Sequence, residues 1–157
     1  MKCRTIEHWQ RLSDLPAMLD ALPDITKELG FRFHDFSFCS PGHHVESGNL
    51  PAGAPALIHA ALELSAPHQQ GSELPLFWTP EIFAATPDMW ARAQAMGLTH
   101  GWVQLLHDGT ARSSLALLRP DASVSAAELY EKAAIVIWVG KQLHRAAAQA
   151  GHGGSSV

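Results

Sequence analysis

A helix followed by two buried strands, in the second half of the chain, limits the possible folds more than any other segment. Thr86-Pro87-Asp88 predicts a helix start, with a hydroxyl N-cap, a proline at the first helical position and an acid at the positive end of the helix dipole. Gly97 predicts a left-handed helix end. Trp102 to Leu106 and Leu115 to Leu118 then predict buried strands, joined by a turn at Asp108-Gly109.

The N-terminal part predicts helices and then a strand. Ser13 or Asp14 can cap a helix with an apolar face. Pro23 should break or kink it, leaving a second short helix before Gly30. Residues 31–39 alternate as a half-buried strand does, and the change of parity predicts an irregularity near His34-Asp35.

The middle and the end of the chain predict a loop and two helices. Residues 40–53, rich in glycine and proline, predict a loop with at most one short extended piece. Residues 54–65 predict a helix, and residues 66–72 a polar connection. Ser125 and Glu128 form a capping box for a last helix that should reach about Gln149. We expect one domain over residues 1–150 and a flexible tail over residues 151–157.

The composition excludes several classes of function for this segment. The net charge is −4 and the 11 lysines and arginines are scattered, so the chain is not expected to bind nucleic acid itself. No apolar run approaches the roughly 20 residues of a membrane helix, and no signal peptide is visible, so we expect no membrane partner. Two cysteines, Cys3 and Cys39, make no disulfide framework and suggest a reducing cytoplasm.

Several motifs, taken in order, resemble the autoinducer-binding domain of LuxR-family quorum-sensing transcription regulators. They are Phe77-Trp78 with the aromatic Phe83 after it, Gly97-Leu98-x-x-Gly101 after a helix, His107 closing a strand, and the strand Leu115 to Arg119. The sequence pattern predicts helices on both faces of a sheet. The resemblance implies the same α/β (α+β) class, as an α-β-α sandwich with an antiparallel sheet of about five strands and a ligand between sheet and helices.

The resemblance also implies a ligand site. Trp78 is expected to donate its indole N–H to the lactone carbonyl of an acyl-homoserine lactone, and the alternative is a core tryptophan bonded to a backbone carbonyl. The walls of a small-molecule pocket and a packed core are made of the same apolar residue types, so the apolar residues around Trp78 fit either a pocket or a core. The expected ligand-binding residues are Trp78, Phe83, Met89, Trp90, Ala93, Leu98, Ala116, Leu50, Phe36 and Phe38.

The chain departs from the family pattern just before this stretch. The family carries an aromatic residue, then a tryptophan, then an aspartate that accepts the hydrogen bond of the ligand amide. Leu50 and Ala54 stand at the first two positions, and no aspartate lies between Ala54 and Trp78. Glu63 and Glu73 are the carboxylates available in that segment.

Other chemistry has little support in the sequence. The ten histidines include no His-x-x-x-His on a predicted helix, and neither cysteine lies in a Cys-x-x-Cys, so we expect surface or structural histidines and no metal site. No nucleophile elbow or glycine-rich phosphate loop is present, so we expect neither an enzyme nor a cofactor.

Two functions remain open. The first is the sensory domain of a LuxR-type regulator, which binds an acyl-homoserine lactone or a related small hydrophobic signal and forms a homodimer. The second is a stand-alone antiactivator that binds no such lactone and forms a heterodimer with a full-length regulator. The wide apolar surface that Ile135, Trp138 and Val139 give the last helix suits a partner. A small-molecule enzyme on a similar sandwich is a weaker third possibility.

Overall fold

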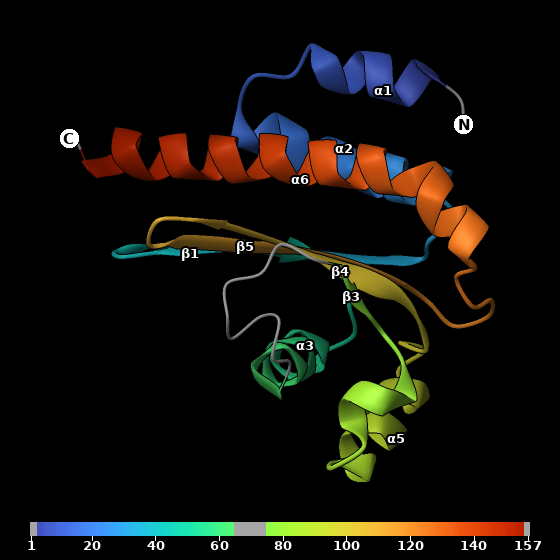
Figure 1. The fold of residues 1–157 in the computed structure, drawn as a ribbon. Coiled ribbons are helices and arrows are strands. Elements are labelled where there is room, and N and C mark those ends of the chain that lie inside the picture. The colour runs from blue at the N-terminus through green and yellow to red at the C-terminus, as the bar shows by residue number, and fades with distance from the viewer. Residues whose placement is uncertain (1–2, 65–74, 156–157) are drawn as a thin grey trace.

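A five-stranded antiparallel sheet lies in the middle of the molecule (Figure 1). This computed structural model describes the backbone of residues 3–64 and 75–155 and the side chains of residues 7–64 and 75–151. The strands follow the order β2-β1-β5-β4-β3 across the sheet. Their bounds are Phe33–Ser40 for β1, His43–Gly48 for β2, Leu76–Phe77 for β3, His100–Asp108 for β4 and Ala111–Arg119 for β5. The antiparallel sheet is as predicted.

Helices cover both faces of the sheet, which confirms the predicted α-β-α sandwich (Figure 1). The face called here the α6 face carries α1 (Cys3–Gln10), α2 (Leu15–Glu28) and α6 (Ala126–Ser155). The α3 face carries α3 (Ala54–Leu64), the 3-10 helix η1 (Pro80–Phe83) and α5 (Pro87–Ala95). Among the described residues, no helix is both long and apolar enough to span a bilayer.

Strand β1 is buried on both faces, and its two faces differ in chemistry. Phe36 and Phe38 belong to the core of the α6 face, whereas Asp35 and Ser37 point to the α3 face. The strand pairs with β5 without interruption from Phe33 to Cys39, so the irregularity predicted near His34-Asp35 is absent. The change of face lies earlier: Phe31, just before the strand, packs in the α6-face core, whereas Phe33 packs on the α3 face.

The α6-face core joins both N-terminal helices, the sheet and the last helix. Trp102 contacts Phe31 edge-on, with ring centroids 5.4 Å apart. Ile135 and Trp138 are half-buried against this core, so part of the apolar surface predicted for a partner is covered within the chain. The buried members are Trp9, Leu15, Met18, Ala21, Leu22, Ile25, Leu29, Phe31, Phe36, Phe38, Trp102, Leu115, Leu117, Val136, Val139, Leu143, Ala146 and Ala147.

The glycines of the second half fix the connections predicted there. Gly97 ends α5 with a φ of +81°, and Gly109 starts the β4–β5 turn with a φ of +61°. Gly101 has a φ of +142°, and a Cβ there would lie 1.9 Å from the carbonyl oxygen of Leu117 on β5. Only glycine fits where the two backbones approach so closely. Thr86 does precede α5, but its hydroxyl makes no capping hydrogen bond, so that detail of the prediction was wrong.

Two helices are longer than the sequence predicted. Helix α2 passes through Pro23 without a break, because buried residues on both sides of the proline, such as Met18 and Ile25, hold one continuous face in the core. The predicted cap of α2 is present, since Asp14 Oδ1 accepts from Ala17 N at 2.8 Å. Helix α6 continues to Ser155, where a flexible tail was predicted from residue 151. Gly151 packs closely against the ring of His43, the first residue of β2, and a Cβ at position 151 would lie 2.7 Å from that ring.

An arginine joins β5 to the start of α6. Arg119 makes two hydrogen bonds to the Glu128 carboxylate, at 2.6 and 2.8 Å, and Lys132 adds a third at 2.6 Å. Ser125 Oγ accepts from Glu128 N at 3.1 Å, which is one half of the predicted capping box, whereas the Glu128 carboxylate binds Arg119 and Lys132. The guanidinium of Arg119 also lies 4.8 Å from the centroid of the Phe31 ring. Arg119, the last residue of β5, therefore has a structural role.

Candidate functional site

The second hydrophobic core lies on the α3 face, between the sheet and the helices α3 and α5. Eight of the predicted ligand-binding residues lie in this core or at its edge. Trp78, Phe83, Ala93, Leu98 and Ala116 are buried, and Leu50, Met89 and Trp90 are half-buried against them. The other buried members are Ala54, Leu57, Ile58, Ala61, Leu62, Leu76, Val103, Leu105 and Leu118.

Phe36 and Phe38, the other two predicted residues, do not join this group. Both side chains lie in the α6-face core, on the opposite side of the sheet. Since successive residues of a strand point to opposite faces, β1 presents Asp35 and Ser37 to the α3 face instead. The sequence signal for this was present, because the polar parity of β1 is the one opposite to the phenylalanines.

Trp78 adopts the alternative arrangement that the sequence left open. Its indole N–H donates to the carbonyl oxygen of Leu98 at 2.8 Å, and its side chain is 2% exposed. Phe83 stacks edge-on against it, with centroids 5.2 Å apart, and Trp90 follows 5.5 Å from Phe83. Because indole has a single donor, Trp78 could donate to a ligand carbonyl only by giving up its bond to Leu98. Trp78 is instead part of an aromatic wall.

A polar cavity adjoins the apolar core between α3 and the strands β1 and β5. Its volume is about 210 Å³. Ser37 and Ser114 face each other across the β1–β5 register in its floor, and Leu62 of α3 connects it to the core. The lining residues are Ser37, Cys39, His59, Leu62, Glu63, Arg112, Ser113 and Ser114. This arrangement offers hydroxyl groups beside an apolar wall.

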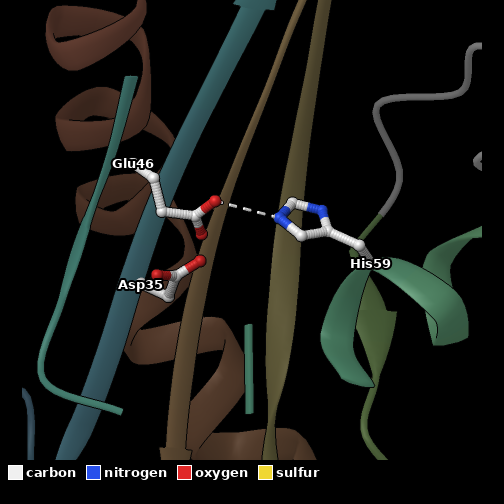
Figure 2. A group of neighbouring side chains, drawn as sticks. All are labelled: Asp35, Glu46 and His59. Atoms are coloured by element: carbon white, nitrogen blue, oxygen red, sulfur yellow. Dashed lines mark hydrogen bonds and ion pairs between the residues drawn. The ribbon is translucent and has the colours of Figure 1, made fainter. Parts of the chain in front are cut away.

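Three titratable side chains converge at the edge of this cavity (Figure 2). Asp35 comes from β1, Glu46 from β2 and His59 from α3, and His59 Nε2 lies 3.2 Å from Glu46 Oε1. Burial, followed by the interaction with Glu46, raises the pKa of Asp35 to about 8. Burial opposes ionisation of Glu46, but its hydrogen bonds with Asp35 and His59 prevail and lower its pKa.

The sequence analysis did not bring these three residues together. The β1–β2 register pairs Ser37 with Glu46 and Asp35 with Gly48, so the two carboxylates are diagonal neighbours on one face. Residues 43–48, which the sequence analysis placed in a loop, form strand β2, and only the pairing of β2 with β1 brings Glu46 beside Asp35. Within α3, His59 has Glu63 four residues further on, but nothing in the sequence placed His59 beside Glu46 of another element. Glu63, the carboxylate considered as a substitute for the family aspartate, lines the cavity, and Glu73 lies outside the described residues.

Comparisons with known proteins agree with this architecture. Residues 66–147 match the family model of the autoinducer binding domain. The transcriptional activator protein PhzR of Pseudomonas fluorescens is 29% identical in an alignment 112 residues long, which covers 65% of this chain and 46% of PhzR. The chain thus spans about half the length of that curated relative.

Solved structures share the fold at low sequence identity. CepR2 of Burkholderia cenocepacia, an N-acylhomoserine lactone dependent LuxR-family factor, matches with a TM-score of 0.71 at 17% identity, over 92% of this chain and 93% of that one. Escherichia coli SdiA in complex with octanoyl-rac-glycerol matches with a TM-score of 0.62 at 19% identity, over 91% of this chain and 61% of SdiA. At these identities the likeness concerns the fold alone.

Proposed function

Since this chain belongs to the autoinducer-binding domain family of LuxR-type regulators, we propose that it senses an acyl-homoserine lactone or a related small hydrophobic signal. The family is a regulatory one and not a family of enzymes. The observation that carries the proposal is the joined apolar core and polar cavity on the α3 face. An acyl chain needs an apolar wall, and its amide and ring need a few polar partners beside that wall.

The fold relatives support this class of ligand. CepR2 is described as dependent on N-acylhomoserine lactone, and SdiA has been solved with octanoyl-rac-glycerol. Both ligand types combine an aliphatic chain with a compact polar head. In this chain we propose that the acyl tail contacts Trp90, Met89 and Ala116. Trp90 and Met89 are half-buried at the edge of the α3-face core, and Ala116 is a small residue within it. The head would bind near Ser37 and Ser114.

The alternative function is that of an antiactivator, which pairs with a full-length LuxR-type regulator and binds no usual lactone. Two observations and one energetic cost favour it. Leu50 and Ala54 occupy the positions of the family aromatic and tryptophan, and both pack into the α3-face core. The donor of Trp78 is already used by Leu98 within the fold. Leaving a ligand amide N–H unpaired would cost about 1–3 kcal/mol of binding energy.

A thermal-shift panel tests the first proposal. The chain is melted alone and with acyl-homoserine lactones of increasing chain length and with octanoyl glycerol. A ligand that binds only the folded state stabilises it by ~2.7 kcal/mol at a hundred times its dissociation constant, which raises Tm by roughly 5–10 °C in a domain of this size. The matched control is the same acyl chain on a ring-opened homoserine, which should shift Tm much less because its added carboxylate loses water on binding beside the apolar core.

The same panel separates the two functions. A flat response to every ligand, together with stable binding to a full-length LuxR-type regulator in size-exclusion chromatography, would establish the antiactivator and overturn the sensor. A shift that depends on acyl length and on the intact ring supports the sensor.

A further inference from the structure

Asp35, Glu46 and His59 form a compact set of metal-ligating groups that the proposed sensing of a signal does not require (Figure 2). One atom from each side chain lies within 4.8 Å of the other two. Around a tetrahedral zinc ion with bonds of about 2.0–2.2 Å, ligand atoms lie roughly 3.4 Å apart. His59 Nε2 and Glu46 Oε1, at 3.2 Å, already have that separation. We propose that these three residues bind a divalent transition-metal ion, and that zinc fits them best.

An independent observation points to a cation at this place. Asp35 is 2% exposed, and its carboxyl group points toward the carboxylate of Glu46 (Figure 2). Among the described residues, no hydrogen-bond donor reaches its Oδ2 atom. A buried carboxylate oxygen without a donor is costly, because the water it loses on folding is not replaced. A metal ion between Asp35 and Glu46 would supply the missing partner of Asp35 Oδ2 and would balance the charge of both carboxylates when they are ionised.

The elements around the cluster hold it in place. Asp35 and Glu46 sit on paired antiparallel strands, so the backbone fixes their separation. Gly48 pairs with Asp35 and packs so closely that a Cβ there would lie 2.8 Å from Asp35 Oδ1. Glycine at this position therefore leaves space for the buried carboxyl group. His59 approaches from α3, which packs on the same face through Ile58 and Leu62.

The kinds of ligand select the class of metal. Calcium and magnesium take six or more oxygen ligands, and an imidazole nitrogen is a poor one for them. One imidazole and two carboxylates suit zinc, and three protein ligands leave a fourth position open. His44 is one candidate for that position, since its Nε2 atom lies 3.7 Å from Glu46 Oε1. His59 also lines the 210 Å³ cavity, so a small oxygen ligand there is a second candidate for the fourth position.

Metal titration of the full chain tests the proposal. The protein is stripped with a chelator and titrated with Zn²⁺ against a chromophoric competitor, and with Co²⁺, whose visible absorption strengthens in tetrahedral coordination. We expect one tight site per chain. Losing an outer partner of a metal ligand already costs about 10–100-fold in affinity, so His59→Ala and Glu46→Gln should each weaken binding at least tenfold.

Matched controls exclude the other histidines and carboxylates. His8→Ala on α1 and Glu131→Gln on α6 change exposed side chains far from the cluster in the fold and should leave the affinity unchanged. Circular dichroism confirms that each variant folds, and both ligand variants alter partly exposed side chains. Absence of a tight site, or a site whose affinity either ligand variant leaves unchanged, would overturn the proposal. Because the readout is the metal and not a lactone, this result is independent of the ligand panel.

Discussion

Trp78 and Trp102 show how one residue type can have different energetic roles on the two faces of a sheet. Both are buried, at 2% and 0% exposure. The indole of Trp78 donates to Leu98, whereas the indole nitrogen of Trp102 has no partner among the described residues. Both residues pack well, but only one of them satisfies a buried carbonyl. The hydrogen bond ties the segment before η1 to the residue that follows the end of α5.

This difference predicts unequal costs for the same substitution. Trp78→Phe and Trp102→Phe both remove the indole and leave a cavity, but Trp78→Phe also leaves the Leu98 carbonyl unpaired. We expect it to lower the free energy of unfolding by about 1–3 kcal/mol more than Trp102→Phe does. Urea denaturation of both variants measures the difference. Equal losses would mean that the Trp78 bond adds nothing beyond packing.

At the scale of elements, Glu128 connects α6 to β5 and should make stability depend on acidity. The Arg119 guanidinium, with Lys132 beside it, lowers the pKa of Glu128 from 4.5 to about 2. A carboxyl whose pKa is depressed in the folded state stabilises the fold above its unfolded pKa. That contribution is lost as the pH falls from about 4.5 toward about 2. Its side chain is 18% exposed, so solvent screens part of the effect.

Glu128→Gln should therefore lower the free energy of unfolding by roughly 1–2 kcal/mol at pH 7. The difference in free energy of unfolding between this variant and the unchanged chain should narrow below about pH 4.5, because protonation then removes the charge of Glu128 in the unchanged chain too. Denaturant titrations at several pH values measure it. Glu131→Gln, an exposed neighbour on the same helix, is the control and should show no such trend. A gap that stays constant down to pH 3 would contradict the assignment.

Elements with strong local signals could be predicted from the sequence, and those that depend on tertiary pairing could not. The β4–β5 hairpin, the end of α5 at Gly97 and the cap at Ser125 follow from side chains within a few residues, and all three are present. Strand β2 carries no apolar alternation, because it is an edge strand with exposed positions, so it was expected as a loop. Without β2 the sequence offered no reason to place Glu46 beside Asp35.

The ligand-binding residues expected from the sequence include residues of the apolar core but none of the polar residues beside it. Apolar residues that wall a pocket are the same residues that fill a core, so eight of the ten predicted residues lie together. Phe36 and Phe38 lie on the opposite face of the sheet, as the alternation of apolar and polar residues in β1 allows, but the sequence does not say which face carries the other eight residues. In the same way, Pro23 alone predicted a break, but packing of the residues on both sides of it keeps α2 continuous.

At the scale of the whole molecule, one sheet separates two cores. Neighbouring residues of β4, Trp102 and Val103, belong to different cores, and so do Leu115 and Ala116 of β5, so these two central strands stabilise both layers. A signal bound on the α3 face would thus stabilise the entire sandwich, although it contacts only one half. The α6 face would respond through the shared sheet.

This division predicts that enlarging a small residue affects ligand sensing on one face only. Ala116 lies in the α3-face core at 1% exposure, and Ala147 lies in the α6-face core at 0%. Overpacking by Ala116→Leu or Ala147→Leu should cost about 1–3 kcal/mol in either case. For any ligand that raises the Tm of the unchanged chain, Ala116→Leu should remove most of the shift, because the new side chain fills the space of the ligand. Ala147→Leu should lower Tm but keep the shift, measured from its own unliganded melt. Loss of the shift in both variants, or in neither, would place the ligand elsewhere than against β5 on the α3 face.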